Sequence, residues 1–337
     1  MSGSSLDGID AVLIEVDENS FNIIHREDIP FDEKLKIRLS ESGSLNIMDY
    51  LSLQSDYSVF LGREINHRFT QSYDYMSVHG HTTHHFPTKL ISNQMVDGGI
   101  LSAMTEKKVV TDFRTGDVAL GGTGTPMIPI AERNLFKGYD YYLNLGGIAN
   151  ITMAANWIAY DVCPCNQLLN YCAQQLGKEY DSNGDLARMG NLDNELYKQL
   201  GAFSYFDEAP PKAIDNNWIK NNYFSILKNK KNTQDTLHTI SLWLSNVIVK
   251  QLASNGKLFI TGGGAHNGFL IDCIRKEGKE NGIEIIVPSK EIVDFKEAIL
   301  MAYLGYLRIS LKPTMLCSVT GAKMDSIGGA IYNVHGT

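Results

Sequence analysis

Residues 257–288 read KLFITGGGAHNGFLIDCIRKEGKENGIEIIVP, and this stretch decides the fold class. Its first five residues, 257–261, are apolar enough to predict a buried strand, and the three glycines Gly262–Gly264 predict a sharp turn. A helix over residues 267–281 follows, and then a second strand and helix, at residues 283–288 and 295–310. This order is typical of an α/β sheet, whose ligands bind at the turns that follow the strands.

The elements upstream of this stretch are mostly strands, with two longer helices. Apolar residues recur at helical intervals over residues 47–73, and a largely apolar helix is expected over residues 236–253. Alternating or short apolar runs predict a hairpin of residues 9–16 with 21–30 and two short strands at residues 75–78 and 109–111. They also predict an antiparallel group of three strands within residues 139–160. A domain boundary is expected near residues 135–140, between the hairpin-and-helix material and the three-strand group.

Composition excludes several classes of protein. The chain has 337 residues, enough for two domains, and its 30 basic and 38 acidic residues give a net charge of −8. Nucleic acid is therefore not expected as a partner, because phosphate binding needs a basic face. No apolar run approaches the roughly 18 residues of a membrane span, and the N-terminus MSGSSLDGID does not resemble a signal peptide. We expect a soluble, intracellular protein whose five cysteines are free thiols.

Glycine stands at the end of four expected strands: in SGSSLDG at residues 2–8, GGTG at 121–124, Gly146-Gly147 and Gly262–Gly264. Glycine lets successive backbone N–H groups approach a phosphate, and the hydroxyls of Ser4 and Ser5 add donors. Asp7 could hold Mg²⁺. Each loop alone is also explained as an ordinary turn. Neither a P-loop nor a dinucleotide fingerprint is present, so a nucleotide would be held by two loops gripping its phosphates from opposite domains, with a glycine turn beneath the base.

Two polar positions are candidates for chemistry. Asp161 directly follows the apolar run WIAY, which suits it as a general base, although an aspartate there could equally cap the next helix. Asp112 and Arg114 form a second cluster, in which Arg114 could bind a carboxylate or a phosphate, or pair with Asp117 as scaffolding.

The ordered motifs resemble those of the anhydro-N-acetylmuramic acid kinase family, from residue 2 to residue 332. They are SGSSLDGID, HGHTTHHFP, TDFRTGDVALGGTGTPMIP, LNLGGIANIT, YDVCPCN, YDSNGDLARMG, TGGGAHNGFL, KEAILMAYLGYL and VTGAKMDSIGGAIY. The resemblance implies a two-domain α/β fold of the hexokinase and actin-like ATPase type, with an active-site cleft between the domains. The expected domains are residues 1–137, joined by the C-terminal segment 312–337, and residues 138–311. The resemblance also implies a cytoplasmic role in cell-wall recycling and suggests a homodimer.

The family's chemistry implies ATP and Mg²⁺ as cofactors and an amino sugar as substrate. Water attacks C1 of the 1,6-anhydro sugar while O6 takes the γ-phosphoryl group, which gives N-acetylmuramic acid 6-phosphate and ADP. The resemblance makes Asp161 the base, and Asp7 the expected magnesium ligand. Nucleotide-binding positions carried over are Gly3, Ser4, Ser5, Leu6, Asp7, Gly8, Ile9, Asp10, Gly146, Gly147, Gly262, Gly263 and Gly264. Sugar-binding positions are Asp112, Arg114, Glu297 and His81, the last standing where the family usually has Gln.

The chain departs from the family pattern at two places that bear on function. After Asp161 the family's Thr-Gly-Pro-Gly is Val162-Cys163-Pro164-Cys165. The family also has a short apolar strand ahead of the first glycine loop, whereas Met1 already stands in that loop. We expect either a chain shortened at its N-terminus or another segment in that place, since an unpaired strand edge is a liability.

Two other functions fit the same motifs. One is a hexokinase-like kinase that acts on a plain hexose or an acetylated amino sugar, and it differs in that phosphorylation would not require the anhydro bond. The other is a catalytically degenerate ATP-binding member of the fold, because the fold by itself does not determine function.

Overall fold

The chain forms two compact units in the computed structural model, which describes residues 1–2, 6, 8–210, 212–228 and 230–335. Unit 1 comprises Met1–Lys137 with Phe295–Thr337, and unit 2 comprises Gly138–Asp294. The first boundary lies where the sequence placed it, between residues 137 and 138. The second lies between residues 294 and 295 instead of 311 and 312.

The second boundary differs because helix α13 (Lys290–Ile309) packs on strand β3 (Tyr75–Ser77) of unit 1. Tyr75 donates a hydrogen bond from its hydroxyl to the Ala302 carbonyl at 3.2 Å, and the Ser77 hydroxyl donates to the Met301 carbonyl. A Cβ at Gly305 would lie 2.8 Å from side-chain atoms of both Tyr75 and Ser77. The helix therefore approaches the strand as closely as only glycine permits, which places residues 295–309 in unit 1.

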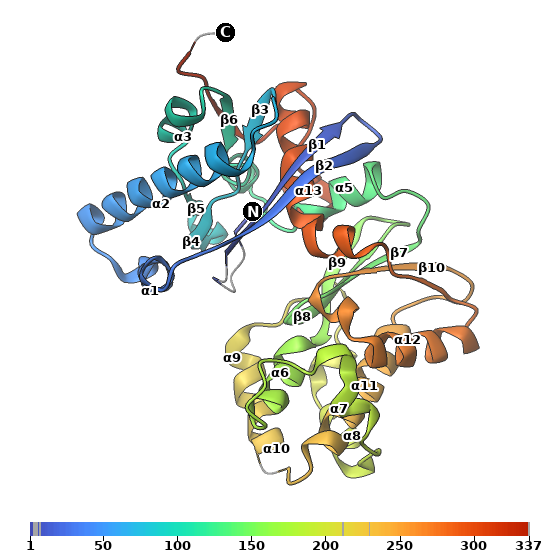
Figure 1. Cartoon of the computed structure of the whole chain (residues 1–337). Helices are drawn as coiled ribbons and strands as arrows, with labels where there is room; N and C mark the ends of the chain where they lie inside the picture. Colours follow the sequence, from blue (N-terminus) through green and yellow to red (C-terminus); the bar gives the residue numbers. More distant parts are fainter. Residues whose placement is uncertain (3–5, 7, 211, 229, 336–337) are drawn as a thin grey trace. The chain divides into compact units, whose positions relative to one another are not determined.

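Unit 1 contains three small sheets and the helices that cover them (Figure 1). The hairpin β1 (Gly8–Val16) and β2 (Phe21–Pro30) confirms the expected one. A three-stranded sheet has the order β12-β6-β3, with β3 and β6 parallel. The third sheet, β4 (His81–Phe86) with β5 (Ile91–Met95), was not expected. The remaining elements are α1 (Glu33–Ser40), α2 (Ile47–Arg68), α3 (Gly98–Thr105), β6 (Lys108–Thr111), α4 (Thr115–Ala119), α5 (Ile128–Asn134), α14 (Cys317–Thr320) and β12 (Ala330–Tyr332).

Helix α2 shows why local chemistry sets a helix's ends better than apolar spacing does. The side chain of Asn46 accepts hydrogen bonds from the backbone N–H groups of Met48 and Asp49, so the helix begins at Ile47. It ends at Arg68, because Phe69 has already left helical geometry, with φ −108° and ψ 86°. The predicted end at residue 73 was wrong.

A cavity of about 590 Å³ lies between β1 and β3 in unit 1, with residues of α2 and α13 also lining it. Among the described residues, β1 pairs with β2 along one edge, while its other edge carries only short pairing to the first two residues of the chain. There the Met1 amino group donates to the Asp10 carbonyl at 2.6 Å. Burial lowers the pKa of this amino group to about 6. The edge of β1 that faces away from β2 thus borders this cavity.

We predict that joining about eight mainly apolar residues to Met1 fills this cavity, extends the pairing along the edge of β1 that faces away from β2, and raises the melting temperature by several degrees. Affinity for ATP should rise too, because Asp10, a predicted nucleotide-binding residue, lies on the same strand. Thermal unfolding and ATP titration measure both effects. The control is an extension of equal length made of Gly and Ser, which cannot pack an apolar cavity. Equal behaviour of the two extended chains would count against the prediction.

Unit 2 is built on a five-stranded sheet with the order β11-β10-β7-β8-β9. Strands β7 (Tyr141–Leu145), β8 (Ile148–Met153) and β9 (Ile158–Pro164) form the expected antiparallel group. Strand β10 (Lys257–Thr261) is parallel to both β7 and β11 (Glu284–Ile286). Three antiparallel strands followed by two parallel ones, joined by helices, make this a mixed α/β domain.

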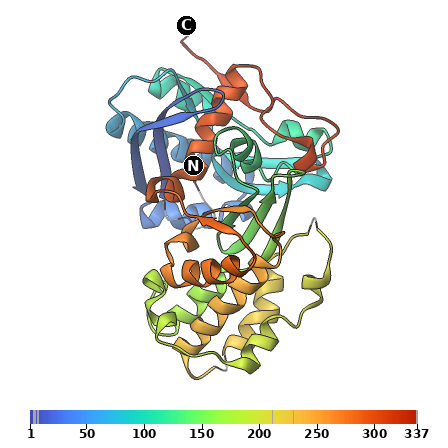
Figure 2. The same ribbon diagram turned by 90° about the vertical axis from the view of Figure 1, so that its right-hand side faces the viewer.

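The helices of unit 2 pack together on one side of this sheet, below it in Figure 2. Helix α11 begins at Thr233 and not at residue 236, because Asn232 caps it. Helix α12 matches the expected range and begins after its cap, Asn267. The helices of unit 2 are α6 (Asn166–Gln174), α7 (Asp185–Arg188), α8 (Asn194–Leu200), α9 (Asn216–Ile219), α10 (Ser225–Lys228), α11 (Thr233–Val249) and α12 (Gly268–Glu280).

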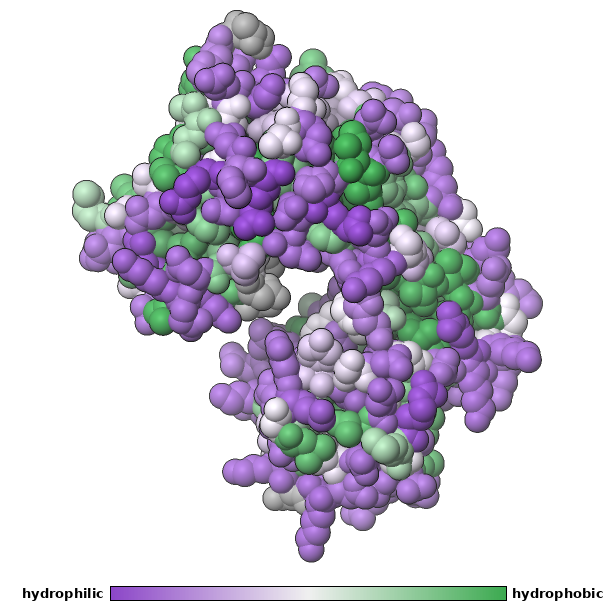
Figure 3. Space-filling view, viewed as in Figure 1, coloured by the Kyte–Doolittle hydropathy of each residue, from purple (hydrophilic) through white to green (hydrophobic). Residues whose placement is uncertain are grey.

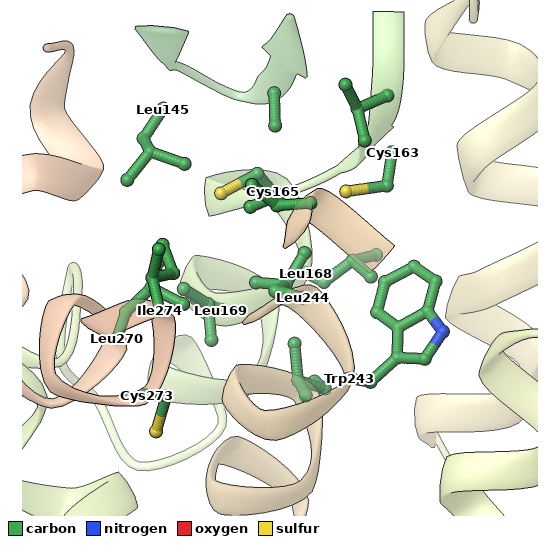
Figure 4. Close-up of a cluster of buried hydrophobic side chains, with 14 of the residues drawn as sticks. Leu145, Cys163, Cys165, Leu168, Leu169, Trp243, Leu244, Leu270, Cys273 and Ile274 are labelled. Atoms are coloured by element: carbon green, nitrogen blue, oxygen red, sulfur yellow. The ribbon is translucent and has the colours of Figure 1, made fainter. Parts of the chain in front are cut away.

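The cysteines of unit 2 belong to its core. Cys163 and Cys165 are buried beside Leu145, Leu168 and Leu244 (Figure 4). All five cysteines of the chain are free, as the sequence predicted. Burial raises the pKa of Cys165 to about 12, so its thiol stays protonated at neutral pH. The Cys-Pro-Cys sequence, at the end of the strand that carries Asp161, therefore supplies apolar side chains to the core of unit 2.

The surface is mainly hydrophilic on the face drawn in Figure 3, where apolar residues form small groups. Within the described part of the chain, helices are either too short or too polar to cross a membrane.

Candidate functional site

Two glycine turns of unit 2 lie side by side at one edge of its sheet. Gly146-Gly147 joins β7 to β8, and Gly262 follows β10, whose last residue Thr261 pairs with Asn144 of β7. Gly262 has a φ of +84°, and a Cβ there would lie 2.4 Å from Asn144 Oδ1. A Cβ at Gly264 would lie 2.7 Å from Leu145 Cβ. The two turns approach so closely that Gly262 and Gly264 leave no room for a side chain.

Asn166 and its neighbours fix the Gly146-Gly147 turn against helix α6. The Asn166 side chain donates from Nδ2 to the Leu145 carbonyl at 2.8 Å, and its backbone N–H donates to the Gly146 carbonyl at 3.1 Å. The Gly147 carbonyl accepts from Cys165 N at 2.9 Å and from Gln167 N at 3.2 Å. These bonds occupy the carbonyls of both glycines, so the turn keeps one shape. The motif YDVCPCN contained Asn166, but sequence reasoning assigned it no role in the site.

A third segment completes this edge of unit 2. A Cβ at Gly184 would lie 2.2 Å from Asn267 Oδ1, and a Cβ at Gly268 would lie 2.3 Å from Asn183 Oδ1. Asn267 Oδ1 also accepts from Leu270 N at 3.0 Å and so caps helix α12. The motif YDSNGDLARMG is thus packed against TGGGAHNG. Both motifs are visible in the sequence, but only the tertiary structure shows that they contact each other.

Asp161 lies within β9, next to a bulge that changes the register between β8 and β9. Its Oδ2 accepts a hydrogen bond from Ile214 N at 2.9 Å, while its carbonyl accepts from the Tyr205 hydroxyl at 2.6 Å. Burial raises the pKa of Asp161 above its ordinary value, and the bond from Ile214 partly offsets this. Helix α6 has Cys165 at its N-cap, so the helix-cap alternative for Asp161 was wrong. A half-buried carboxylate with a raised pKa fits a general base.

The candidate residues of unit 1 follow two parallel strands, β3 and β6, whose carboxyl ends meet at the same edge of the sheet. His79 follows β3, while Asp112 and Arg114 follow β6. Asp112 has a left-handed φ of 57° and accepts from the Thr115 hydroxyl at 2.5 Å. Burial lowers the pKa of Arg114 to about 10, while nearby Glu297 acts in the opposite direction. The fold therefore brings Arg114 and Glu297 into one electrostatic cluster.

Asp117 accepts hydrogen bonds from groups other than Arg114. Its two carboxylate oxygens accept from the Thr320 hydroxyl and from Gly124 N, each at 2.8 Å. A Cβ at Gly124 would lie 3.3 Å from Arg114 Cβ. Asp117 therefore shapes the Gly121–Gly124 loop around Arg114, and the expected alternative of an Arg114–Asp117 ion pair was wrong.

The histidines of the HGHTTHH segment are placed differently from one another. His81 is buried and bonds to the backbone of Leu39; desolvation is the main reason why its pKa is lowered. His85 Nδ1 is 3.0 Å from the Ser92 hydroxyl, and Arg114 contributes to lowering the pKa of His85. His79, which sequence reasoning did not select, also lies close enough to Arg114 for its pKa to be affected. His81 stays a predicted sugar contact.

The first glycine loop is only partly described. Gly3, Ser4, Ser5 and Asp7, all predicted to bind nucleotide or metal, lie outside the described residues. Gly8 has no room for a Cβ, which would lie 2.5 Å from the Ile29 carbonyl oxygen, and Ile9 is buried. Leu6 has a left-handed φ of 56°.

The described residues contain no group of three or more His, Cys, Asp or Glu side chains that could hold a metal ion. Mg²⁺ in kinases is held by one or two carboxylates together with substrate phosphates and water, so it needs no such group. A single carboxylate in the first glycine loop is compatible with that kind of binding.

Comparison with known proteins places the chain in one family. The family model described as anhydro-N-acetylmuramic acid kinase matches residues 1–334. The anhydro-N-acetylmuramic acid kinase of Nitrosomonas europaea is 32% identical, over 98% of both chains. Those of Aliivibrio fischeri and Sulfurimonas denitrificans are each 31% identical over 98% of this chain, and over 97% and 98% of their own lengths. The chain therefore belongs to the anhydro-N-acetylmuramic acid kinase family.

Proposed function

We propose that this protein is an ATP-dependent kinase that opens 1,6-anhydro-N-acetylmuramic acid with water and phosphorylates its O6, giving N-acetylmuramic acid 6-phosphate and ADP. The observation that carries the proposal is the family match over residues 1–334; Asp161, a half-buried aspartate whose pKa is raised, supports it. The substrate and product are those of cell-wall recycling, and we place the reaction in the cytoplasm.

Asp161 acts as the general base in the proposed reaction. Its carboxylate takes a proton from water, and the water oxygen forms a bond to C1 as the bond from C1 to the bridging oxygen breaks. That oxygen, now O6, forms a bond to the γ-phosphorus of ATP, and ADP leaves. The bond from Ile214 N holds Oδ2, so the carboxylate keeps its direction while the other oxygen is free to accept the proton.

The nucleotide is bound by glycine turns in this proposal. Backbone N–H groups of Gly146 and Gly147 bind phosphate oxygens, and the turn Gly262–Gly264 lies beneath the nucleoside. The first loop, from Gly3 to Asp10, binds phosphates as well. Mg²⁺ would be held by Asp7 and would neutralise charge on the phosphates.

The sugar is bound by residues of unit 1 in this proposal. Arg114, half-buried and beside the tight Gly124 turn, donates hydrogen bonds to the sugar, and Asp112, Glu297 and His81 are further contacts. Burial strengthens the contribution of Arg114, because a guanidinium removed from water interacts more strongly with a polar ligand. We also propose that the protein works as a homodimer, as the family resemblance suggests.

The test is incubation of the protein with ATP, Mg²⁺ and 1,6-anhydro-N-acetylmuramic acid, followed by mass spectrometry of the sugar. The expected product is heavier by one phosphoryl group and one water. The control substrate is N-acetylglucosamine, which lacks the anhydro bond and should not react. A product that gains phosphate alone, or reaction of the control sugar, would identify an ordinary sugar kinase instead. If no ADP forms, the protein is a catalytically degenerate member of the fold.

A further inference from the structure

Asp161 is held by the loop between helices α8 and α9, of which the proposed reaction uses Ile214 alone. The backbone N–H of Asp161 donates to the Lys212 carbonyl at 3.0 Å, and Ile214 N–H donates to Asp161 Oδ2 at 2.9 Å. The Tyr205 hydroxyl donates to the Asp161 carbonyl at 2.6 Å. This loop therefore supplies a partner for both backbone groups and for one carboxylate oxygen of the proposed base.

The bonds to Asp161 follow the pattern of a parallel strand pair, with one bond displaced. Strand β9, which carries Asp161, is the outer strand of its sheet and has β8 as its neighbour. In a parallel pair, a residue donates to the residue before its partner, and its carbonyl accepts from the residue after that partner. Asp161 opposite Ala213 makes the first of these bonds, to Lys212. The second would join Ile214 N–H to the Asp161 carbonyl, but Ile214 N–H bonds to the carboxylate instead.

The Tyr205 hydroxyl takes the acceptor that this second bond would use. Tyr205 is buried, and its ring packs on that of Trp218 with the centroids 5.5 Å apart, which fixes the direction of the hydroxyl. Lys212 ties the loop together, because its Nζ donates to the Tyr205 carbonyl at 2.8 Å and lies 4.5 Å from the centre of the Tyr205 ring. The two parts of the loop that contact Asp161 are thus bonded to each other.

We propose that Tyr205 is a positioning residue for Asp161, because its hydroxyl occupies the Asp161 carbonyl and so directs Ile214 N–H to the carboxylate. This inference rests on the proposed function, in which Asp161 is the base. The bond to Oδ2 orients the carboxylate and leaves its other oxygen to take the proton from water. Without the Tyr205 hydroxyl, Ile214 N–H would move to the Asp161 carbonyl and complete the parallel pairing. The carboxylate would then lose its orientation.

The pH dependence of the reaction reports on this bond, because only the ionised carboxylate can act as a base. The bond from Ile214 N favours the charged form, and so it opposes the rise that burial causes in the pKa of Asp161. Losing that bond should therefore raise the pKa of Asp161 further. The acid limb of the kcat profile, where turnover falls as the carboxylate is protonated, should then move to higher pH.

Other titratable groups around Asp161 do not produce this titration. The Tyr205 hydroxyl and the Cys163 thiol interact electrostatically with Asp161, and burial raises the pKa of both, so both are neutral at neutral pH. Strand β8 has no titratable side chain. On helix α11, Asp235 and His238 are bonded to the backbone of Asn191 and Ala187. The charged residues of the loop itself are Asp207, Glu208, Lys212 and Asp215. Its three carboxylates are exposed.

The test compares Tyr205→Phe with Tyr223→Phe. Tyr223 is the matched control, because it is also a buried tyrosine of unit 2 and donates to a backbone carbonyl, that of Leu200, at 3.1 Å. Each variant removes one hydrogen bond, so each should melt a few degrees below wild type. In Tyr205→Phe alone, we expect kcat to fall about tenfold and the acid limb to move up by about one pH unit. An acid limb that stays in place in Tyr205→Phe, or moves equally in Tyr223→Phe, would overturn the inference.

A second measurement needs neither turnover nor a stable variant. In wild type labelled with ¹⁵N-isoleucine, the Ile214 amide signal should shift with pH as Asp161 ionises, and this shift should disappear in Tyr205→Phe. A wild-type Ile214 signal that does not respond to pH contradicts the inference even if no variant folds, and so does an unchanged response in Tyr205→Phe. Failure of the proposed function is distinct, because the wild type would then not phosphorylate the sugar, whatever the amide signal shows.

Discussion

Replacing Asp161 by Asn is expected to lower kcat about 10³-fold, while sugar and ATP still bind. The amide has the size of the carboxylate, and its oxygen can still accept the hydrogen bond from Ile214 N that holds residue 161 in place. It cannot take a proton from water, so only the chemical step should suffer. Steady-state kinetics with both substrates, together with binding titrations of each, separate these effects.

The control for this variant is Asp215→Asn, in the same unit. Asp215 is exposed and caps helix α9, a role that Asn fills as well, so kcat should stay within twofold of wild type. The wild-type kcat should also rise with pH through the pKa of Asp161, which burial holds above its ordinary value, because the protonated acid cannot act as a base. Near-normal turnover in Asp161→Asn would remove this residue from the role.

Replacing Gly262 by Ala is expected to destabilise unit 2 by about 2–4 kcal/mol and to weaken ATP binding severely. The new Cβ would lie 2.4 Å from Asn144 Oδ1 and 2.9 Å from backbone atoms of Leu145, at a φ of +84°. The strand end cannot move away, because β7 is hydrogen-bonded on both sides. In thermal unfolding this corresponds to a melting temperature lower by roughly 5–10 °C.

The neighbouring glycine provides a matched control. A Cβ at Gly263 would be 3.7 Å from its nearest contact, the Nδ2 atom of Asn166, which is an ordinary distance. Gly263→Ala should therefore unfold within about 1 °C of wild type. Equal destabilisation by the two substitutions would show that loss of glycine flexibility, and not the contact between the turns, determines the stability of this loop.

Local sequence was enough to predict most elements of the sheet that carries the site. The strand predicted for the run KLFIT was confirmed at every residue, and the three strands predicted after residue 139 were all present. Errors occurred where side-chain caps and not apolar spacing set an end, as at Asn232 before α11. The β4–β5 hairpin was missed because its strands hold three histidines and few apolar residues, so they show no strand periodicity.

The candidate site was less predictable than the fold. Asp161 and Arg114 could be singled out because each comes after an apolar run in the sequence, although Asp161 proved to lie within its strand, β9. His79 could not, since a histidine two residues from His81 has no distinguishing pattern, and only burial and the lack of a partner for Nε2 separate the two. Asn166 was overlooked for a similar reason, because its bonds to the carbonyls of Leu145 and Gly146 join residues about 20 positions apart.

The sequence by itself determined which residue types stand at the ends of the strands, because strand formation and glycine turns depend on nearest neighbours along the chain. The stretch 257–288 accordingly sufficed for the α/β class. Tertiary structure alone decided which of those ends meet. Parallel pairing of β10 with β7 brings Gly262 against Asn144, and parallel pairing of β3 with β6 brings His79 near Arg114. Such contacts depend on sheet register and burial, which arise only when distant segments pack together.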